Sequence, residues 1–278
     1  MSKIFHNLAE PGLLAAVESN FAEEMACFGR SLPGGILHQD EELMWFLTGP
    51  NGPNGILLTN FIHDDQNHID KRIDETLNLF KARQVREVGW RIGPTSNPPD
   101  LANYLEVHEL NHKATTTCMI MKVTETFIAS PQSEHIEIRE VLTSDELLLK
   151  CTIEKIGFDA TDHMAHDYYQ TYVQSGFGHD ASWHHYMGWQ DGQAVAVAAV
   201  LLHQGIAGIY GVATLPHARK QGIATTLMHH ILREIARLGY ALVTLSPTEM
   251  SDALYRRLGF QDYCQLHHYR LAFAIADA

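Results

Sequence analysis

The stretch that decides the fold is GIYGVATLPHARKQGIATTLMHHILREIARLG, which covers residues 208–239. Its pattern predicts a strand, a short basic loop and a long amphipathic helix. Gly222 at the helix entrance allows a ligand to approach the backbone closely. The free N–H groups of the first helical turn favour an anion, and Arg219 and Lys220 add positive charge. The stretch therefore predicts a site for a phosphate-bearing ligand.

Composition limits the class of protein. The chain has 278 residues and a net charge of −13, with 45% hydrophobic and 19% charged residues. Its length predicts two globular domains. The acidic balance argues against a nucleic-acid or anionic-membrane partner and is compatible with cationic acceptors. We expect a cytoplasmic protein with reduced thiols, because the four cysteines are far apart and form no CxxC pair: Cys27, Cys118, Cys151 and Cys264.

One uncharged segment has the length of a membrane span. Residues 192–218 contain no Asp, Glu, Lys or Arg. The segment is broken at His203-Gln204-Gly205, and it is rich in Val, Ile, Gly and Ala. We therefore predict two buried strands joined by a tight turn.

The order of predicted elements indicates an α/β fold, in which helices flank a mixed sheet in each of two domains. In the first half we expect helix 8–28, strands 36–48 and 56–61, helix 69–84, strand 85–92, helix 100–110 and strand 115–126. In the second half we expect strand 136–141, helices 143–156 and 162–174, strands 183–190, 194–203 and 206–214, helix 222–238, strand 240–246, helix 251–258 and strand 260–273. The polar segment 129–134 is the expected linker between domains 1–128 and 135–278.

The two halves repeat the same order of elements. The strand at 54–61 and the elements after it match the strand at 207–214 and its successors, which indicates an internal duplication. The first copy has Asp64 and Asp65 where the second has the basic loop. Two aspartates repel a phosphate, so we expect the first copy to be degenerate and the second to bind the cofactor.

Two motifs in the second half resemble a known family. Arg219-x-x-Gly222-x-Ala224 precedes a helix, and Leu254-Tyr255 is followed by Gly259-Phe260. Together they resemble the signatures of the GNAT acetyltransferase superfamily, R/Q-x-x-G-x-G/A and a later Leu-Tyr-x-x-x-Gly-Phe. The resemblance is specific over 136–273 and only architectural over 1–128. The whole chain resembles a tandem GNAT protein.

The resemblance implies acetyl-CoA as cosubstrate and assigns roles to residues. Backbone N–H groups of the loop would cradle the pyrophosphate, and a splayed strand would pair with the pantetheine arm. Tyr255 would donate a proton to the leaving thiolate. Thr248 stands where the family often has Asn. The expected cofactor-binding residues are Val212, Ala213, Thr214, Arg219, Lys220, Gln221, Gly222, Ile223, Ala224 and Thr248.

Histidine and aspartate side chains are the candidates for a general base and for a metal site. The sequence leaves several bases open, on predicted strands or near the acceptor side: His184, His185, His203, Asp162 and Asp180. The chain has eighteen histidines, but it has no HExxH motif and no Cys/His cluster, so we expect no metal.

The leading hypothesis is an N-acetyltransferase that works by direct transfer in a ternary complex, because no cysteine lies in an activating motif. The alternative hypothesis is a non-catalytic acyl-CoA-binding or sensing protein. A third hypothesis is a transferase that uses a longer acyl donor. The acceptor would be a primary amine of a small molecule or peptide; aminoglycosides, polyamines, amino-sugar conjugates, and peptide N-termini or lysines stay open. A homodimer is compatible with this arrangement.

Overall fold

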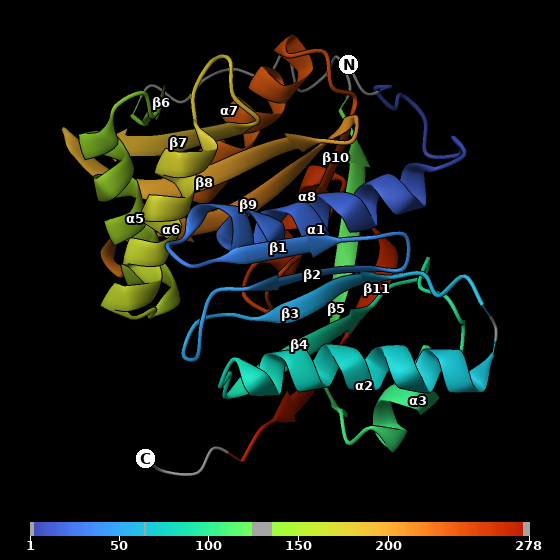
Figure 1. The fold of residues 1–278 in the computed structure, drawn as a ribbon. Coiled ribbons are helices and arrows are strands. Elements are labelled where there is room, and N and C mark those ends of the chain that lie inside the picture. Colours follow the sequence, from blue (N-terminus) through green and yellow to red (C-terminus); the bar gives the residue numbers. More distant parts are fainter. Residues whose placement is uncertain (1–2, 64, 124–134, 275–278) are drawn as a thin grey trace. The chain divides into compact units, whose positions relative to one another are not determined.

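The computed structural model describes residues 3–63, 65–123 and 135–274 (Figure 1). The chain divides into two compact units. Unit 1 combines Met1–Asn20 with Met119–Asp262, and unit 2 combines Phe21–Cys118 with Tyr263–Ala278. Each unit is therefore assembled from segments that lie far apart in the sequence. The predicted linker 129–134 lies outside the described residues, so the division into domains 1–128 and 135–278 stays a prediction.

Unit 1 is built on a mixed sheet with the strand order β5-β10-β9-β8-β7-β6. Strands β6 to β9 form an antiparallel meander, β9 and β10 run parallel, and β10 pairs antiparallel with the end of β5. Its strands are the end of β5 (Asn111–Lys122), β6 (Glu137–Glu140), β7 (Trp183–Gln190), β8 (Gln193–His203), β9 (Ile206–Thr214) and β10 (Leu242–Leu245). Its helices are the start of α1 (Leu13–Ser31), α5 (Ser144–Phe158), α6 (Asp162–Ser175), α7 (Ile223–Arg237) and α8 (Asp252–Leu258), with a 3-10 turn at Pro216–Ala218.

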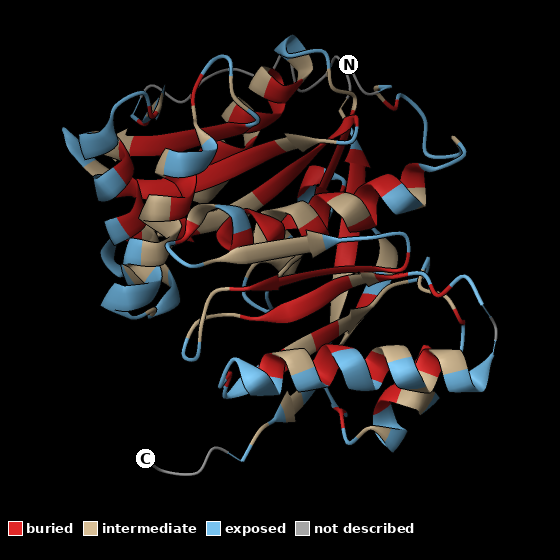
Figure 2. Ribbon diagram, viewed as in Figure 1, coloured by how far each residue is buried: buried red, intermediate tan, exposed pale blue. Residues whose placement is uncertain are grey.

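The main core of unit 1 lies between its sheet and the helices α7 and α8, while α5 covers the opposite face (Figure 1). Helix α7 presents Ile223, Leu227, Ile231 and Ile235 at helical spacing, and all four are buried. Strand β8 is buried over most of its length (Figure 2) because helices cover both faces of the sheet. The prediction of two buried strands within 192–218 is confirmed by β8 and β9. No helix in the described part of the chain is long and apolar enough to cross a membrane.

A buried amide holds the β8–β9 hairpin of unit 1. The Asn20 side chain donates to the carbonyl oxygen of Leu201 at 3.3 Å and accepts from the Tyr210 hydroxyl at 2.7 Å. Asn20 is fully buried, so these partners satisfy polar atoms that water does not reach. This contact explains why the first turns of α1 belong to unit 1.

Unit 2 repeats the strand–helix–strand–helix order of unit 1. Its sheet has the order β1-β2-β3-β4-β11-β5, in which β3 and β4 are parallel and β4 and β11 antiparallel. Helices α2 and α3 pack on one face of this sheet over a core that includes Trp90 and Phe80. The elements are the rest of α1, β1 (Ile36–Gln39), β2 (Leu43–Leu47), β3 (Gly55–Thr59), α2 (Gln66–Ala82), β4 (Glu87–Ile92), α3 (Leu101–Val107), the start of β5 and β11 (Gln261–Ala272).

The single strand expected over 36–48 is wrong. The segment is a hairpin of β1 and β2. The Asp40 carboxylate accepts hydrogen bonds from the backbone N–H groups of Glu42 (2.9 Å) and Leu43 (2.7 Å). An aspartate that bonds the backbone two and three residues ahead closes a turn, and this turn separates β1 from β2.

Candidate functional site

The central feature of unit 1 is the point where β9 parts from β10. The two parallel strands pair at Ala207 with Val243 and at Gly208 with Thr244. Strand β9 continues to Thr214, whereas β10 ends at Leu245. The last residues of β9 therefore present backbone groups on an edge that β10 does not cover. This uncovered edge lies where the splay of 212–214 is expected.

A β-bulge lies in β9 at the same place. The register of β8 and β9 shifts between Val197 and Ala199, so that Gly211 and Val212 oppose the single residue Ala198. Gly211 has a φ of +58°, a left-handed conformation that favours glycine. A bulge leaves one residue out of the ladder and redirects its backbone groups. The N–H groups around Val212 are therefore available to a ligand in the splay.

A carboxylate occupies the space beside this bulge. A Cβ atom on Gly211 would lie 1.8 Å from Oε1 of Glu154, which projects from α5. Lys150, one turn earlier, is fully buried and forms an ion pair with Glu154. The Lys150 ammonium also lies 4.6 Å from the centre of the Tyr172 ring. Glu154 is thus held against the backbone of β9 by a buried cation.

The loop between β9 and α7 ends in an open helix terminus. Lys220 and Gly222 have φ values of +61° and +80°. Gly222 is the N-cap of α7, and among the described side chains none caps this helix. The first-turn N–H groups lack intrahelical acceptors, so this terminus suits an anion. By contrast, the Asp65 carboxylate of unit 2 caps α2 by accepting the His68 N–H at 3.2 Å.

The Arg219 side chain braces the loop. Its Nε donates to the carbonyl oxygen of Thr214 at 3.0 Å, and its Nη2 donates to that of Gly157 at 3.2 Å. A Cβ atom on Gly157 would lie 2.5 Å from the Cβ of Ala213, so α5 approaches β9 closely here. The guanidinium therefore joins the loop to β9 and α5, and the charged side chain of Lys220 is exposed on the loop.

Two other expected residues lie at α8. Tyr255 is buried and belongs to the same apolar cluster as Val212 and Ile223. Burial raises the pKa of the Tyr255 hydroxyl to about 12, partly offset by a hydrogen bond with Ser251. The phenol therefore keeps its proton at neutral pH. Thr248 is exposed, and its hydroxyl lies 3.0 Å from that of Ser251.

The proposed bases have different surroundings. Asp180 is exposed, and Asp162 pairs with Lys155 at 2.6 Å. The Nδ1 of His184 lies 2.8 Å from Glu140, and the Nε2 of His203 lies 3.0 Å from the Ser19 hydroxyl. His185 is fully buried against Tyr172 and Trp183, where an acceptor does not reach it.

Sequence reasoning missed Glu154 as a site residue. Its position follows from the packing of α5 on β9, which a one-dimensional pattern does not reveal. Two signals were present: Gly211 interrupts a strand pattern, which is typical of a bulge, and Lys150 and Glu154 are spaced i,i+4 on a helix. Within the described residues, no group of three His, Cys, Asp or Glu side chains could hold a metal ion.

An open helix terminus beside a splayed, bulged strand is the central feature of this α/β domain. Residues 148–260 match the model of the acetyltransferase (GNAT) family. The resemblance drawn from the Gly222 and Tyr255 motifs is thereby confirmed. No curated protein sequence matches the chain.

Solved structures show the same fold over nearly the whole chain. A GCN5-related N-acetyltransferase from Kribbella flavida is 18% identical with a TM-score of 0.70, covering 93% of this chain and 96% of that chain. A tandem GNAT protein from the clavulanic acid biosynthesis pathway is 12% identical with a TM-score of 0.66, covering 94% and 96%. A GCN5-related N-acetyltransferase from Sphaerobacter thermophilus is 16% identical with a TM-score of 0.58, covering 94% and 90%. The chain therefore has a tandem GNAT fold.

The buried His185 predicts a specific dependence of stability on pH. Burial, and then the nearby Lys150 and His184, hold its pKa well below 6.5. The folded state keeps this imidazole neutral, whereas the unfolded chain binds a proton below pH of about 6.5. The stability present above that pH is therefore lost as the pH falls. Relative to His185→Phe, the wild type should lose about 1.4 kcal/mol of unfolding free energy per pH unit between pH 6 and 5.

Urea unfolding of both proteins at pH 7, 6 and 5 measures this difference. Trp183→Phe changes the packing beside His185 without removing a titrating group, and its difference from wild type should stay constant with pH. Parallel curves for wild type and His185→Phe would contradict the prediction.

Proposed function

We propose that this chain is an acetyl-CoA-dependent N-acetyltransferase that acts on a primary amine of a small molecule or peptide by direct attack in a ternary complex. The observation that carries the proposal is the uncapped start of α7 next to the end of β9, whose edge towards β10 is not paired. The start of α7 suits a pyrophosphate, and the edge of β9 suits the amides of a pantetheine arm. A cytoplasmic location and a homodimer remain predictions from the sequence.

The proposed cofactor site uses both backbone and side-chain groups. The N–H groups of Gly222, Ile223 and Ala224 would face the pyrophosphate, with the Lys220 charge nearby and Gln221 beside it. Val212 to Thr214 would pair with the pantetheine arm. Arg219 acts in this proposal as a brace for the loop, because its guanidinium is already engaged by two carbonyl groups. Thr248 would contribute at the rim, where it is exposed.

We propose that the bulge, Glu154 and Tyr255 perform the transfer. A backbone N–H near Val212 would stabilise the oxyanion that forms on the thioester carbonyl. Glu154, a carboxylate beside the bulge, would take the proton that the amine loses when its nitrogen bonds to the carbonyl carbon. The carbon–sulfur bond breaks, and Tyr255 would give its proton to the thiolate.

The surroundings of Cys151 favour direct transfer over a cysteine intermediate. This thiol lies on α5, and burial raises its pKa to about 12. A thiol with such a pKa stays protonated and is a poor nucleophile.

The alternative function is a non-catalytic acyl-CoA-binding protein. One assay distinguishes it from the enzyme: release of free thiol from acetyl-CoA across a panel of primary amines.

Gly222→Glu tests the pyrophosphate site against its isosteric control Gly222→Gln. A Cβ atom at residue 222 meets nothing within 4 Å, so both side chains have room, and both carry the same strain at positive φ. Only the glutamate repels an anion. We expect calorimetry to show an acetyl-CoA affinity at least about tenfold weaker for Glu than for Gln. Equal affinities would remove the cofactor assignment.

Tyr255→Phe tests the general acid. Loss of the hydroxyl should lower kcat by about 100-fold, whereas KM for acetyl-CoA changes little because the ring still packs in the core. Steady-state kinetics with an amine acceptor measure both constants. Tyr240→Phe, a half-buried tyrosine in the same unit, should leave both unchanged. An unaltered kcat in Tyr255→Phe would end its role as acid.

Glu154→Gln tests the general base without changing side-chain size. We expect kcat/KM for the acceptor to fall by about 100-fold at neutral pH. The deficit should shrink as the pH rises, because hydroxide can then remove the proton that the attacking nitrogen loses. Asp145→Asn, on the same helix, is the control. A deficit that is constant with pH would point to a structural role for Glu154.

A further inference from the structure

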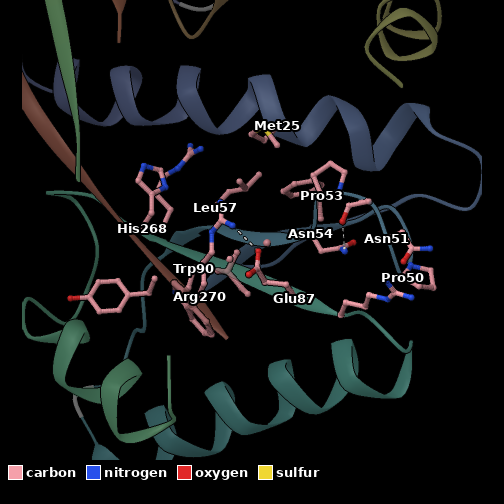
Figure 3. A pocket seen from close by; sticks show the side chains of 18 residues that line it. Met25, Pro50, Asn51, Pro53, Asn54, Leu57, Glu87, Trp90, His268 and Arg270 are labelled. Atoms are coloured by element: carbon pink, nitrogen blue, oxygen red, sulfur yellow. Dashed lines mark hydrogen bonds and ion pairs between the residues drawn. The ribbon is translucent and has the colours of Figure 1, made fainter. Parts of the chain in front are cut away.

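Unit 2 contains a cavity of about 750 Å³ on the face of its sheet that points towards α1 (Figure 3). Met25 of α1 lies above it, His268 of β11 lies at one end, and the loop with Pro50 and Asn51 lies at the other. This volume falls in the range of pockets for small ligands. All residues that line it belong to unit 2, so the cavity is separate from the site at α7.

Two glycines form the floor of this cavity. Gly55 of β3 and Gly89 of β4 are register partners on adjacent parallel strands. Neither has a side chain, so the sheet surface is bare at this point. A Cβ atom on Gly89 would meet only Asn54 O at 3.7 Å and Tyr269 O at 4.0 Å, which are ordinary contacts. The hollow therefore exists because residue 89 is glycine, and a side chain there would fill it.

Cationic side chains form the wall next to the glycines. Arg91 and His268 are cross-strand partners, and Arg270 lies opposite Gly89. They share one face of the sheet, because the alternate residues Trp90 and Tyr269 pack into the core on the other face. Arg270 forms an ion pair of 2.7 Å with Glu87, drawn as a dashed line in Figure 3.

The charge of the lining is opposite to that of the chain. Three arginines (Arg86, Arg91 and Arg270) line the cavity together with one carboxylate, Glu87. The chain as a whole carries a net charge of −13. A concentration of positive charge in an acidic protein raises the local concentration of anions. The cavity is therefore suited to a ligand with negative charge.

The far wall is preformed. The Asn54 side chain accepts the backbone N–H of Thr48 at 2.8 Å and donates to the carbonyl oxygens of Gly49 (2.9 Å) and Gly52 (2.8 Å). These bonds hold the loop at 48–54 in one shape. A wall that is rigid before binding lowers the entropy that a ligand must overcome.

His268 reports on the electrostatics of the cavity. Burial, and then the charges of Arg91 and Arg270 with smaller effects of His267 and His112, lower its pKa to about 4. The imidazole is therefore neutral at neutral pH, although its Nε2 keeps a partner 3.0 Å away, the Thr116 hydroxyl. An anion beside these arginines would offset their charge and raise the pKa of His268.

We propose that this cavity is a second ligand site, which binds a small organic molecule through a carboxylate or phosphate group. The anionic group lies between Arg270 and the pair of Arg91 and His268, over the bare backbone of Gly89. The rest of the molecule contacts Met25 and Leu57, which supply apolar surface on the opposite side. The site is independent of the acetyl-CoA site proposed for unit 1.

The test follows the imidazole resonance of His268 by NMR, assigned by its absence in His268→Gln. Inorganic phosphate and succinate are the probes, and sodium chloride at equal ionic strength is the control for screening. The pKa of His268 should rise from about 4 towards 6.5 with at least one probe and stay lower with chloride. Phosphate and succinate distinguish the two kinds of anionic group.

Variants of the full chain locate the effect. Gly89→Val fills the floor and should abolish the probe-dependent shift. Arg270→Gln should weaken the apparent affinity by about tenfold, whereas Glu87→Gln, which removes a competing anion, should strengthen it severalfold. Arg83→Gln removes one charge from unit 2 outside the cavity and should match wild type. The proposal is overturned if chloride acts like both probes, or if Gly89→Val and Arg270→Gln respond like the wild type.

Discussion

The candidate site of unit 1 depends on the parting of two parallel strands. Strand β9 pairs with β10 only as far as Gly208, and a bulge at Gly211 then turns its backbone out of the ladder. Helix α5 holds β9 in this position from the other face, through the close approach of Gly157 to Ala213 and the bonds of Arg219. The backbone edge and the Glu154 carboxylate meet because this packing is tight.

The two units use one topology for different chemistry. In unit 1 the helix after the central strand begins at an uncapped glycine, whereas in unit 2 the corresponding helix begins with the Asp65 carboxylate already in place. A helix terminus whose N–H groups already bond a carboxylate of the chain attracts a phosphate only weakly. Unit 2 instead gathers arginines on the opposite sheet face, over Gly55 and Gly89. The two units thus share the order of strands and helices and differ in the charge at this helix start.

Much of the fold was predictable because its signals are local. The helix at Ser144–Phe158 begins with a capping box in which Thr143 and Glu146 exchange hydrogen bonds, a signal that spans only four residues. Gly222 at the start of α7 and the buried strands β8 and β9 were equally visible. The hairpin at Asp40 was missed because its turn, in the polar segment 38–42, contains no glycine or proline that would mark it. Glu154 was missed because its role arises from a contact between elements.

The sequence by itself determined the order of elements, the resemblance to the GNAT family and the loop before α7. These follow from periodicity, glycine positions and short motifs, which act within a few residues. Only the tertiary structure decided that the end of β5 pairs with β10 in unit 1 and that β11 pairs with β4 in unit 2. Backbone hydrogen bonds can form between any two strands, so the side chains of one strand do not specify which strand it pairs with. The packing of the whole sheet decides the pairing.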